Sequence, residues 1–366
     1  MLTWRRFKIT AILIVTALVI LSYIFLGIPT SSSKALRTLS LFQLRRRSLA
    51  VETFVVDSGH TEKKRRRLPN LEKLTWPERE CLLFPVGAPV TRQLPFKAQC
   101  SRGQMRTLWK LFNLFANVME ELSFSDRWML YGGSLLGSFR HHDIIPWDDD
   151  LDVLVDKEVR PALWKKMRTL MPNYTIQESG QRDKICAKLI MPANTLLDVE
   201  GSRKLSTYDW SWPSVDIGYY ISNVTHITEV ARSYGRSYSY PKSDVFPLLL
   251  RPFYKTWVPT PRNTFAFTLQ TYPGSLKCTS LTWSHAYETG LAGRTLPCVD
   301  LSKRYAFVER NPLFNLVQVD DEGLEQLDWV REKLVRGGKV IHEISLVSPR
   351  GEAYIDTYML HKKLNP

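Results

Sequence analysis

The stretch YGGSLLGSFRHHDIIPWDDDLD, residues 131–152, contains the densest negative charge of the chain. Four carboxylates fall within five positions: Asp148, Asp149, Asp150 and Asp152. The apolar run 153–155 follows directly, and a Gly-Gly-Ser turn precedes the cluster. This order predicts a buried strand that begins in acids, behind a glycine turn and a short helix.

We expect three of these acids to share one side of the strand, because alternate residues of a strand face the same way. These are Asp150 and Asp152, joined by Asp148 if the strand begins early. Two like charges about 5 Å apart repel by roughly 3 kcal/mol at an effective dielectric near 20. A divalent cation, Mg²⁺ or Mn²⁺, removes that repulsion. We expect Asp149 to point the other way, toward backbone or a cap. The alternative is an acidic turn on a solvated surface.

The turn Gly132, Gly133 and Ser134 lies between an expected strand and an expected helix. Glycines let backbone N–H groups approach an anion, and the beginning of a helix favours negative charge. We therefore expect these three residues to bind a phosphate group next to the metal. Arg140 and Lys188 are candidates for offsetting the charge of a pyrophosphate, and the alternative for each is an ordinary surface cation.

A third acid from a separate strand usually completes such a site. Asp216, in the apolar stretch SVDIGYY, is the best candidate, and Asp198 is the second. We expect Asp216, together with Asp150 and Asp152, to act in catalysis, either by accepting the proton of an acceptor hydroxyl or by holding a second metal. The alternative for Asp216 is a buried carboxylate bonded to backbone.

The motif GGSLLGSFRHHDIIPWDDDLDV closely resembles the LicD family, which includes bacterial phosphocholine transferases, fukutin and fukutin-related protein. Looser matches are the strand around Lys188 and VFPLLLRPFYKTWVPTPRN at 245–263, so the resemblance spans 128–274. It implies a nucleotidyltransferase-like α/β (α+β) fold, a mixed sheet flanked by helices. It also implies metal ligands at Asp148, Asp150 and Asp152, and transfer of a phospho-alcohol from a CDP-activated donor to a glycan hydroxyl.

Two features depart from that family. The chain has no clustered cysteines of the zinc-binding kind found in fukutin-related protein, so zinc is not expected. Residues 278–366 match no pattern that we can name. A glycosyltransferase that holds a nucleotide sugar through an Asp-x-Asp pair, and an inactive lumenal scaffold, are the competing functions. Trp210, Trp212 and Trp257 either stack on a sugar or base or pack in the core.

The basic excess of the chain lies in its first residues. The formal net charge is +14, but residues 1–67 hold 13 Lys/Arg and 3 Asp/Glu, a net of +10, which leaves +4 for the rest. A folded part with so small an excess argues against nucleic acid as a partner. The sequence is compatible with a homo-oligomer.

The N-terminal region predicts a membrane anchor. Residues 9–28 are uncharged and apolar, and twenty helical residues span roughly 30 Å, one bilayer core. We expect a cytosolic tail at 1–8, a signal anchor at 9–28, a basic stem at 29–75 and one lumenal domain at 76–366, in a single-pass type II protein of the Golgi or ER. A cleaved signal peptide is the alternative.

A lumenal location makes glycans and disulfides plausible. Asn173 and Asn223 begin glycosylation sequons. Sequence proximity favours Cys81–Cys100 and Cys278–Cys298 as pairs, with Cys186 as the free thiol, although sequence does not fix the connectivity.

Hydrophobic periodicity predicts the remaining elements. We expect helices over 104–122, 135–141, 160–171 and 320–338. We expect strands over 127–131, 150–155, 184–192, 195–201 and 214–222. Residues 240–275 predict irregular loops with local helix.

Overall fold

The structure, a computed structural model, describes residues 53–54, 68–87, 93–205, 208–233, 235–272, 277–319 and 326–360. The chain divides into two compact units, 1–51 and 52–366, and the described residues all belong to the second. The expected tail (1–8), anchor (9–28) and most of the stem (29–75) lie outside them. Within the described ranges, no helix has the length and apolar character needed to cross a membrane.

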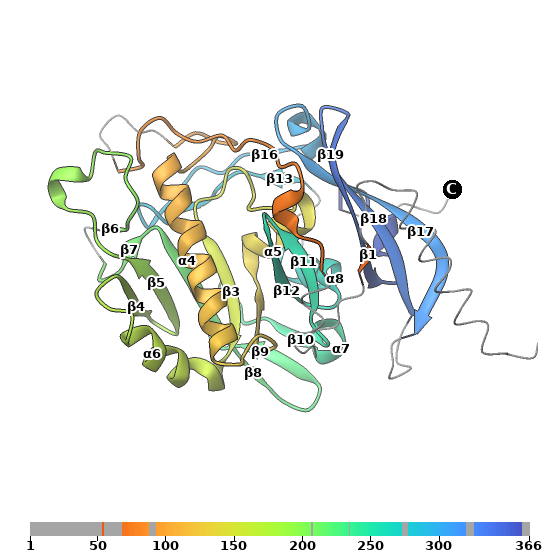
Figure 1. The fold of residues 1–366 in the computed structure, drawn as a ribbon, viewed down its shortest axis with the longest axis horizontal. Coiled ribbons are helices and arrows are strands. Elements are labelled where there is room, and N and C mark those ends of the chain that lie inside the picture. The colour runs from red at the N-terminus through yellow and green to blue at the C-terminus, as the bar shows by residue number, and fades with distance from the viewer. Residues whose placement is uncertain are drawn as a thin grey trace, which may run out of the picture. The chain divides into compact units, whose positions relative to one another are not determined.

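A seven-stranded mixed sheet forms the centre of the second unit (Figure 1). Its order is β10-β9-β8-β3-β2, with β5 also paired to β8 and β4 to β5. Strands β3 and β8 run parallel, and the other neighbours are antiparallel. The strands are β2 Trp128–Leu130, β3 Leu151–Asp156, β4 Tyr174–Ser179, β5 Arg182–Ala187, β8 Ser214–Ser222, β9 His226–Glu229 and β10 Ser239–Pro241.

The register of three strands sets the chemistry of one end of this sheet. Asp152 on β3 lies opposite Asp216 on β8, and Lys184 on β5 lies opposite the same Asp216 from the other side. Residues at paired positions on neighbouring strands have side chains on the same face. The sheet therefore places two acids and a lysine side by side, although they are far apart in sequence.

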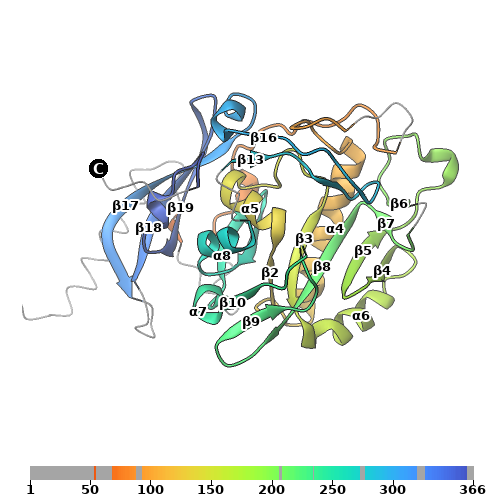
Figure 2. The same ribbon diagram turned by 180° about the vertical axis from the view of Figure 1, so that it is seen from behind.

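Five α-helices are described: α4 Arg102–Glu121, α5 Gly132–His141, α6 Arg160–Arg168, α7 Lys242–Val245 and α8 Thr264–Thr271. Helix α4 begins with a capping box between Ser101 and Gln104. Its apolar stripe, which includes Leu108, Phe112 and Phe115, is fully buried in the largest core cluster. Helices α4 and α6 cover one face of the sheet, and Figure 2 shows the opposite face.

Short elements connect these layers. The 3-10 turns are η1 Leu71–Lys73, η2 Lys157–Val159, η3 Pro192–Asn194, η4 Cys298–Leu301 and η5 Glu352–Tyr354. The two-stranded pairs are β6 Arg203–Lys204 with β7 Ser211–Trp212, β11 Leu249–Phe253 with β12 Thr256–Thr260, β13 Cys278–Thr279 with β16 Thr295–Leu296, and β14 Trp283–Ser284 with β15 Thr289–Gly290. A disulfide joins Cys278 to Cys298. We call residues 278–298 the disulfide segment.

A second, four-stranded sheet has the order β1-β19-β18-β17. Its strands are β1 Thr53–Phe54, β17 Phe307–Val319, β18 Gln326–Arg336 and β19 Lys339–Pro349. The expected helix over 320–338 is wrong for its described part, because 326–336 form β18. Gly337 and Gly338, both at positive φ, make the turn between β18 and β19.

A buried network of charges joins this second sheet to α5 and β11. Glu332 of β18 forms ion pairs with Arg251 of β11, at 2.6 Å, and with Arg310 of β17, at 2.8 Å. The same carboxylate lies 2.9 Å from Nε2 of His142, the residue that ends α5. Because all four side chains are at most 3% exposed, each depends on the others for its partners.

Most of the expected elements are confirmed. The helices around 104–122, 135–141 and 160–171 and the strands around 127–131, 150–155, 184–192 and 214–222 all form. The expected strand at 195–201 is wrong, since turns and bends follow η3 in these residues. Two stretches inside the expected stem also belong to the folded unit. Residues 53–54 pair with β19, and Leu71 is buried against Ile344 and Leu346.

The cysteine expectations are confirmed in part. Cys278 and Cys298 are bonded, and Cys186 is a buried free thiol. Cys81 and Cys100 are also free thiols, so the expected Cys81–Cys100 bond is absent from this structure.

Candidate active site

Three acids meet where β3 and β8 begin. Asp150, Asp152 and Asp216 each offer a carboxylate oxygen, and these three oxygens lie within 4.8 Å of one another. Asp150 and Asp216 are each 6% exposed, and Asp152 is half-buried. The parallel register of β3 and β8 produces this cluster, as expected from the alternation of side chains on a strand.

Asp216 has two fixed partners on its own side of the sheet. Lys184 forms an ion pair with its Oδ2, and the hydroxyl of Ser214 donates to its Oδ1 over 2.9 Å. Burial alone would raise the pKa of Asp216, but the adjacent Lys184 outweighs burial and holds that pKa below its ordinary value. Asp216 therefore has only a weak tendency to take up a proton.

The glycines at the beginning of α5 lie against the acids. A Cβ on Gly132 would come within 2.6 Å of Asp152 Oδ2, and one on Gly133 within 2.6 Å of Asp148 Oδ2. Gly132 also has φ +56°, a conformation that favours glycine. The expected glycine turn thus brings carboxylates of the protein itself to the positive end of the helix.

Ser134 and Asp148 also lie at this end of α5. The hydroxyl oxygen of Ser134 accepts the N–H of Asp152 over 2.9 Å, which ties the helix to β3. Asp148 lies beside the three-acid cluster rather than in it. Burial, and then the charge of Asp149, raises the pKa of Asp148 to about 7.

Asp149 is not a member of the three-acid cluster, and one of its carboxylate oxygens binds backbone, as expected. Its Oδ2 accepts the N–H groups of His285, at 3.1 Å, and of Ala286, at 3.4 Å. Its backbone carbonyl accepts the indole N–H of Trp212 over 2.8 Å. These bonds anchor the disulfide segment to the acidic stretch.

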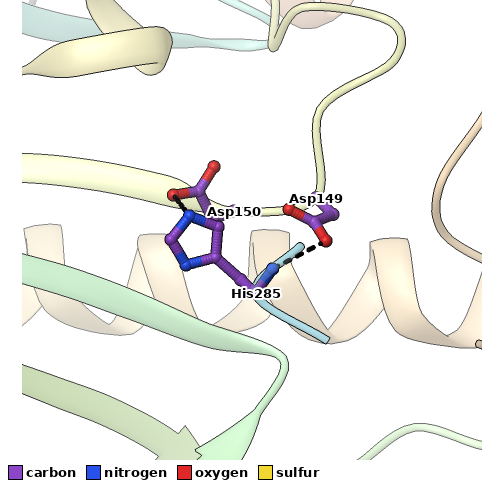
Figure 3. A group of neighbouring side chains, drawn as sticks. All are labelled: Asp149, Asp150 and His285. Atoms are coloured by element: carbon purple, nitrogen blue, oxygen red, sulfur yellow. Dashed lines mark hydrogen bonds and ion pairs between the residues drawn. The ribbon is translucent and has the colours of Figure 1, made fainter. Parts of the chain in front are cut away.

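The disulfide segment brings two side chains to the acids that the sequence does not indicate. His285 Nε2 lies 3.1 Å from Asp150 Oδ2, and its Nδ1 lies 3.9 Å from Asp216 Oδ2 (Figure 3 shows the contact with Asp150). Glu288 Oε1 lies 3.6 Å from Lys184 Nζ. No local motif marks His285 or Glu288, because only the folded chain brings them to β3 and β5.

The acids also change the proton affinities around them. Burial, reinforced by the neighbouring carboxylates, raises the pKa of Asp150 and of Asp152 well above the usual range. Burial would lower the pKa of His285, but the carboxylates around it, Asp150 foremost, outweigh burial and raise it to about 9. Without a cation, the cluster therefore resists full ionisation.

Several expected site residues lie elsewhere. Arg140 is buried in the last turn of α5, where Arg310 is a neighbouring charge, and it is not brought to the acids. Lys188 is exposed beyond the end of β5, and Lys184 on that strand pairs with Asp216 instead. Asp198 accepts the N–H of Gly103 at the beginning of α4.

The three tryptophans differ in their surroundings. Trp212 is buried in the core, and the indole N–H of Trp257 donates to the backbone of Pro69. Trp210 is half-buried beside the site: its ring stacks on Tyr208, and its indole N–H donates to Glu288 over 2.9 Å.

Comparison with known proteins identifies the part of the chain that carries this site. Residues 125–263 match the family model described as LicD/FKTN/FKRP, nucleotidyltransferase domain. This domain belongs to the LicD family. The match includes the glycine turn, the acids of β3 and Asp216, and it ends before the disulfide segment.

Other comparisons add little to the LicD assignment. Among solved structures, the chain is similar to the lincomycin-bound lincosamide antibiotic adenylyltransferase LnuA, at 15% sequence identity and a TM-score of 0.28. That similarity covers 45% of this chain and 86% of the other, and so low a TM-score supports no conclusion. No curated protein matches the chain. The LicD domain indicates a transferase of the nucleotidyl or phosphotransfer type.

Proposed function

We propose that this chain is a metal-dependent transferase of nucleotidyltransferase-like fold. It moves a phospho-alcohol, such as phosphocholine, ribitol phosphate or glycerol phosphate, from a CDP-activated donor to a glycan hydroxyl. The observation that carries the proposal is the three-acid cluster of Asp150, Asp152 and Asp216 inside a LicD domain. The acceptor glycan is on a glycoprotein or glycolipid.

The residues of the cluster fit Mg²⁺ or Mn²⁺. All three donors are carboxylate oxygens, the ligands that these hard ions prefer, and their spacing suits a single ion after small side-chain adjustments. A bound divalent ion neutralises charge on the donor diphosphate. Asp148 lies beside this set, so we assign the metal to Asp150, Asp152 and Asp216 rather than to Asp148, Asp150 and Asp152.

The other residues of the site bind the donor and hold the metal ligands in place. Asp216 acts as a ligand rather than as a base, because Lys184 keeps its pKa low. Lys184 holds that carboxylate in place and adds positive charge close to the expected position of the diphosphate. The stacked pair of Trp210 and Tyr208 lies on the same side, since Lys184 Nζ is 5.7 Å from the Trp210 ring. An aromatic surface there suits the cytosine ring of the donor.

The location remains part of the proposal. We place the catalytic domain in the lumen of the Golgi or ER, behind an anchor at 9–28. The disulfide between Cys278 and Cys298 favours an oxidising compartment. Asn173 and Asn223 both lie at exposed positions, where glycosylation is sterically possible.

A donor assay tests the proposed function. The purified full chain is incubated with Mg²⁺, a glycan acceptor pool and CDP-choline, CDP-ribitol or CDP-glycerol, with UDP- and GDP-sugars in parallel, and released nucleotide is quantified. We expect CMP release from one CDP-alcohol, at least a hundredfold loss in Asp152→Asn, and retained activity in Asp156→Asn. Asp156 is the matched control, because it lies on the same strand but pairs with Arg127.

The outcomes separate the competing functions. Turnover of a nucleotide sugar alone identifies a glycosyltransferase and overturns the proposal. Absence of any turnover, together with thermal stability that Mg²⁺ and CDP leave unchanged, identifies an inactive scaffold. Mass spectrometry of the product glycans then names the transferred alcohol.

A further inference from the structure

A second group of possible metal ligands lies next to the three-acid cluster. Asp149, Asp150 and His285 each offer one ligand atom, and these atoms lie within 4.8 Å of one another (Figure 3). Asp150 belongs to both groups. His285 comes from the disulfide segment, outside the residues that match the family model.

Asp149 has one oxygen that the fold leaves for a ligand. Its Oδ2 is held by the backbone N–H groups of His285 and Ala286, which fixes the orientation of the carboxylate. Its Oδ1 is buried and has no partner at hydrogen-bonding distance among the described residues, although burial raises the pKa of this carboxylate and the side-chain amide of Gln93 acts to lower it. Figure 3 shows the second oxygen turned toward Asp150 rather than toward the His285 backbone. A buried carboxylate oxygen without a donor is costly unless an ion binds it.

The spacing of His285 and Asp150 suits two ligands of one ion. Their facing atoms, Nε2 and Oδ2, are 3.1 Å apart. Metal–nitrogen and metal–oxygen bonds of about 2.0–2.2 Å, at angles of about 90–110°, place two neighbouring ligand atoms roughly 3.0–3.4 Å apart. The existing contact can therefore open around an ion with little movement of either side chain.

The donor atoms also indicate the kind of ion. The three-acid cluster offers oxygen alone, whereas this second group adds an imidazole nitrogen. Imidazole favours a first-row transition metal such as Zn²⁺ over Mg²⁺, and Mn²⁺, which also accepts carboxylates, is the ion with which both groups can be probed. A carboxylate shared between two neighbouring ions is a common arrangement in enzymes that act on phosphate esters.

We propose that Asp149, Asp150 and His285 form a second divalent-metal site, selective for a transition metal ion, which the disulfide segment completes. The proposal rests on the proposed function only through Asp150, which both sites share. Its consequence is that the chain binds two Mn²⁺ ions but has only one site that accepts Mg²⁺ well.

Metal titration of the full chain tests this site. Calorimetric titration and Mn²⁺ electron paramagnetic resonance measure stoichiometry and affinity after removal of metal with EDTA. We expect two Mn²⁺ ions per wild-type chain and one in His285→Asn, with Mg²⁺ affinity changed less than threefold in that variant. His226→Asn is the matched control and retains two ions, because His226 contacts Thr225 and belongs to neither group of ligands.

A second variant tests the site with a smaller risk of misfolding. Asp149→Asn keeps an oxygen for the backbone N–H groups but removes the charge, so we expect a fold retained by circular dichroism and at least a tenfold weaker second Mn²⁺ site. Unchanged Mn²⁺ stoichiometry and affinity in both variants overturns the second site and leaves the proposed function intact. Absence of Mn²⁺ and Mg²⁺ binding by the wild-type chain overturns both proposals.

Discussion

Two glycines of α5 have different neighbours, and each therefore has a different use. A Cβ on Gly133 would meet the carboxylate of Asp148, whereas one on Gly137 would meet the backbone oxygen of Asp143 at 2.5 Å. A side chain can move aside, but a backbone segment inside the fold cannot. Gly133 therefore serves the site, and Gly137 serves the packing of α5.

This difference predicts opposite effects for two alanine substitutions. Gly133→Ala has helix propensity in its favour, by about 1 kcal/mol, so we expect little change in the free energy of unfolding. We expect a loss of turnover, because the added Cβ displaces the carboxylate of Asp148 beside the three-acid cluster. Gly137→Ala loses about 1–3 kcal/mol of stability. Denaturant unfolding and the donor assay of both variants measure this. Equal stability losses in the two would contradict the assignment.

Replacing Lys184 should change how the free energy of unfolding depends on pH in metal-free buffer. In the wild type, the depressed pKa of Asp216 contributes stability above its unfolded pKa, and this is lost as pH falls through the lower folded pKa. Lys184→Met leaves Asp216 buried without its cation, at a cost of about 3–5 kcal/mol at pH 7. Because burial then raises the Asp216 pKa, the difference from the wild type shrinks as pH falls. Urea unfolding in EDTA between pH 4 and 8 checks this, and a constant difference would exclude it.

At the residue scale, local pattern identified the acids but not their partners. The sequence predicts the positions of Asp150, Asp152 and Asp216, because the alternation of side chains on an apolar strand can be seen within a few residues of each. Lys184, His285 and Glu288 face them only through strand register and the path of the disulfide segment. The sequence does not show where β5 ends, so it does not reveal that Lys184, rather than Lys188, faces Asp216.

The disulfide segment carries both a covalent bond, Cys278–Cys298, and a side chain of the site, His285. The Cys278–Cys298 bond closes a loop of sequence separation 20. It reduces the conformational entropy of the unfolded chain, which stabilises the folded state by about 3 kcal/mol. Replacing both cysteines by serine should lower the free energy of unfolding by about that amount. It should also weaken Mn²⁺ binding, because His285 is then less firmly held. Cys81→Ser, which removes a free thiol, is the control and should leave both quantities unchanged. A double variant with unaltered Mn²⁺ binding would show that the bond does not support the site.

Strand β18 shows why one element was mispredicted. A helix is expected where acids come first, cations come last and glycine follows, and this segment has that order. In this structure, however, Gly337 and Gly338 form the turn of a β-hairpin. Val330, Glu332 and Leu334 alternate on the buried side of β18. The charged Glu332 interrupts an apolar alternation, because its partners Arg251 and Arg310 come from other strands. Glu332 is buried only because of these tertiary contacts, which the local sequence does not show.

In the molecule as a whole, the family-matched residues contain only part of the core against which they pack. Helix α4 supplies Phe112 and Phe115, which contact Trp128, yet α4 precedes residue 125. Glu332, the partner of buried His142, follows residue 263. The LicD domain therefore depends on chain from both sides, which no motif within 125–263 indicates.

A truncation experiment measures this dependence. We expect a fragment of residues 125–263 to bind a hydrophobic dye and to lack a cooperative thermal transition, because it loses α4 and the charges around Glu332. A fragment of residues 68–366 should unfold in one cooperative transition. Cooperative unfolding of the shorter fragment would show that the matched residues form a self-sufficient domain.

The separation of Asp149 from Ser284, 135 positions along the chain, also orders the assembly of the molecule. A ribosome that adds about 5–20 residues per second needs roughly ten seconds to travel between them. Throughout that interval the acids of β3 have been synthesised, but the backbone that anchors Asp149 and the imidazole that faces Asp150 have not. The catalytic centre can therefore close only near the end of translation, and the Cys278–Cys298 bond forms after the acids it helps to enclose.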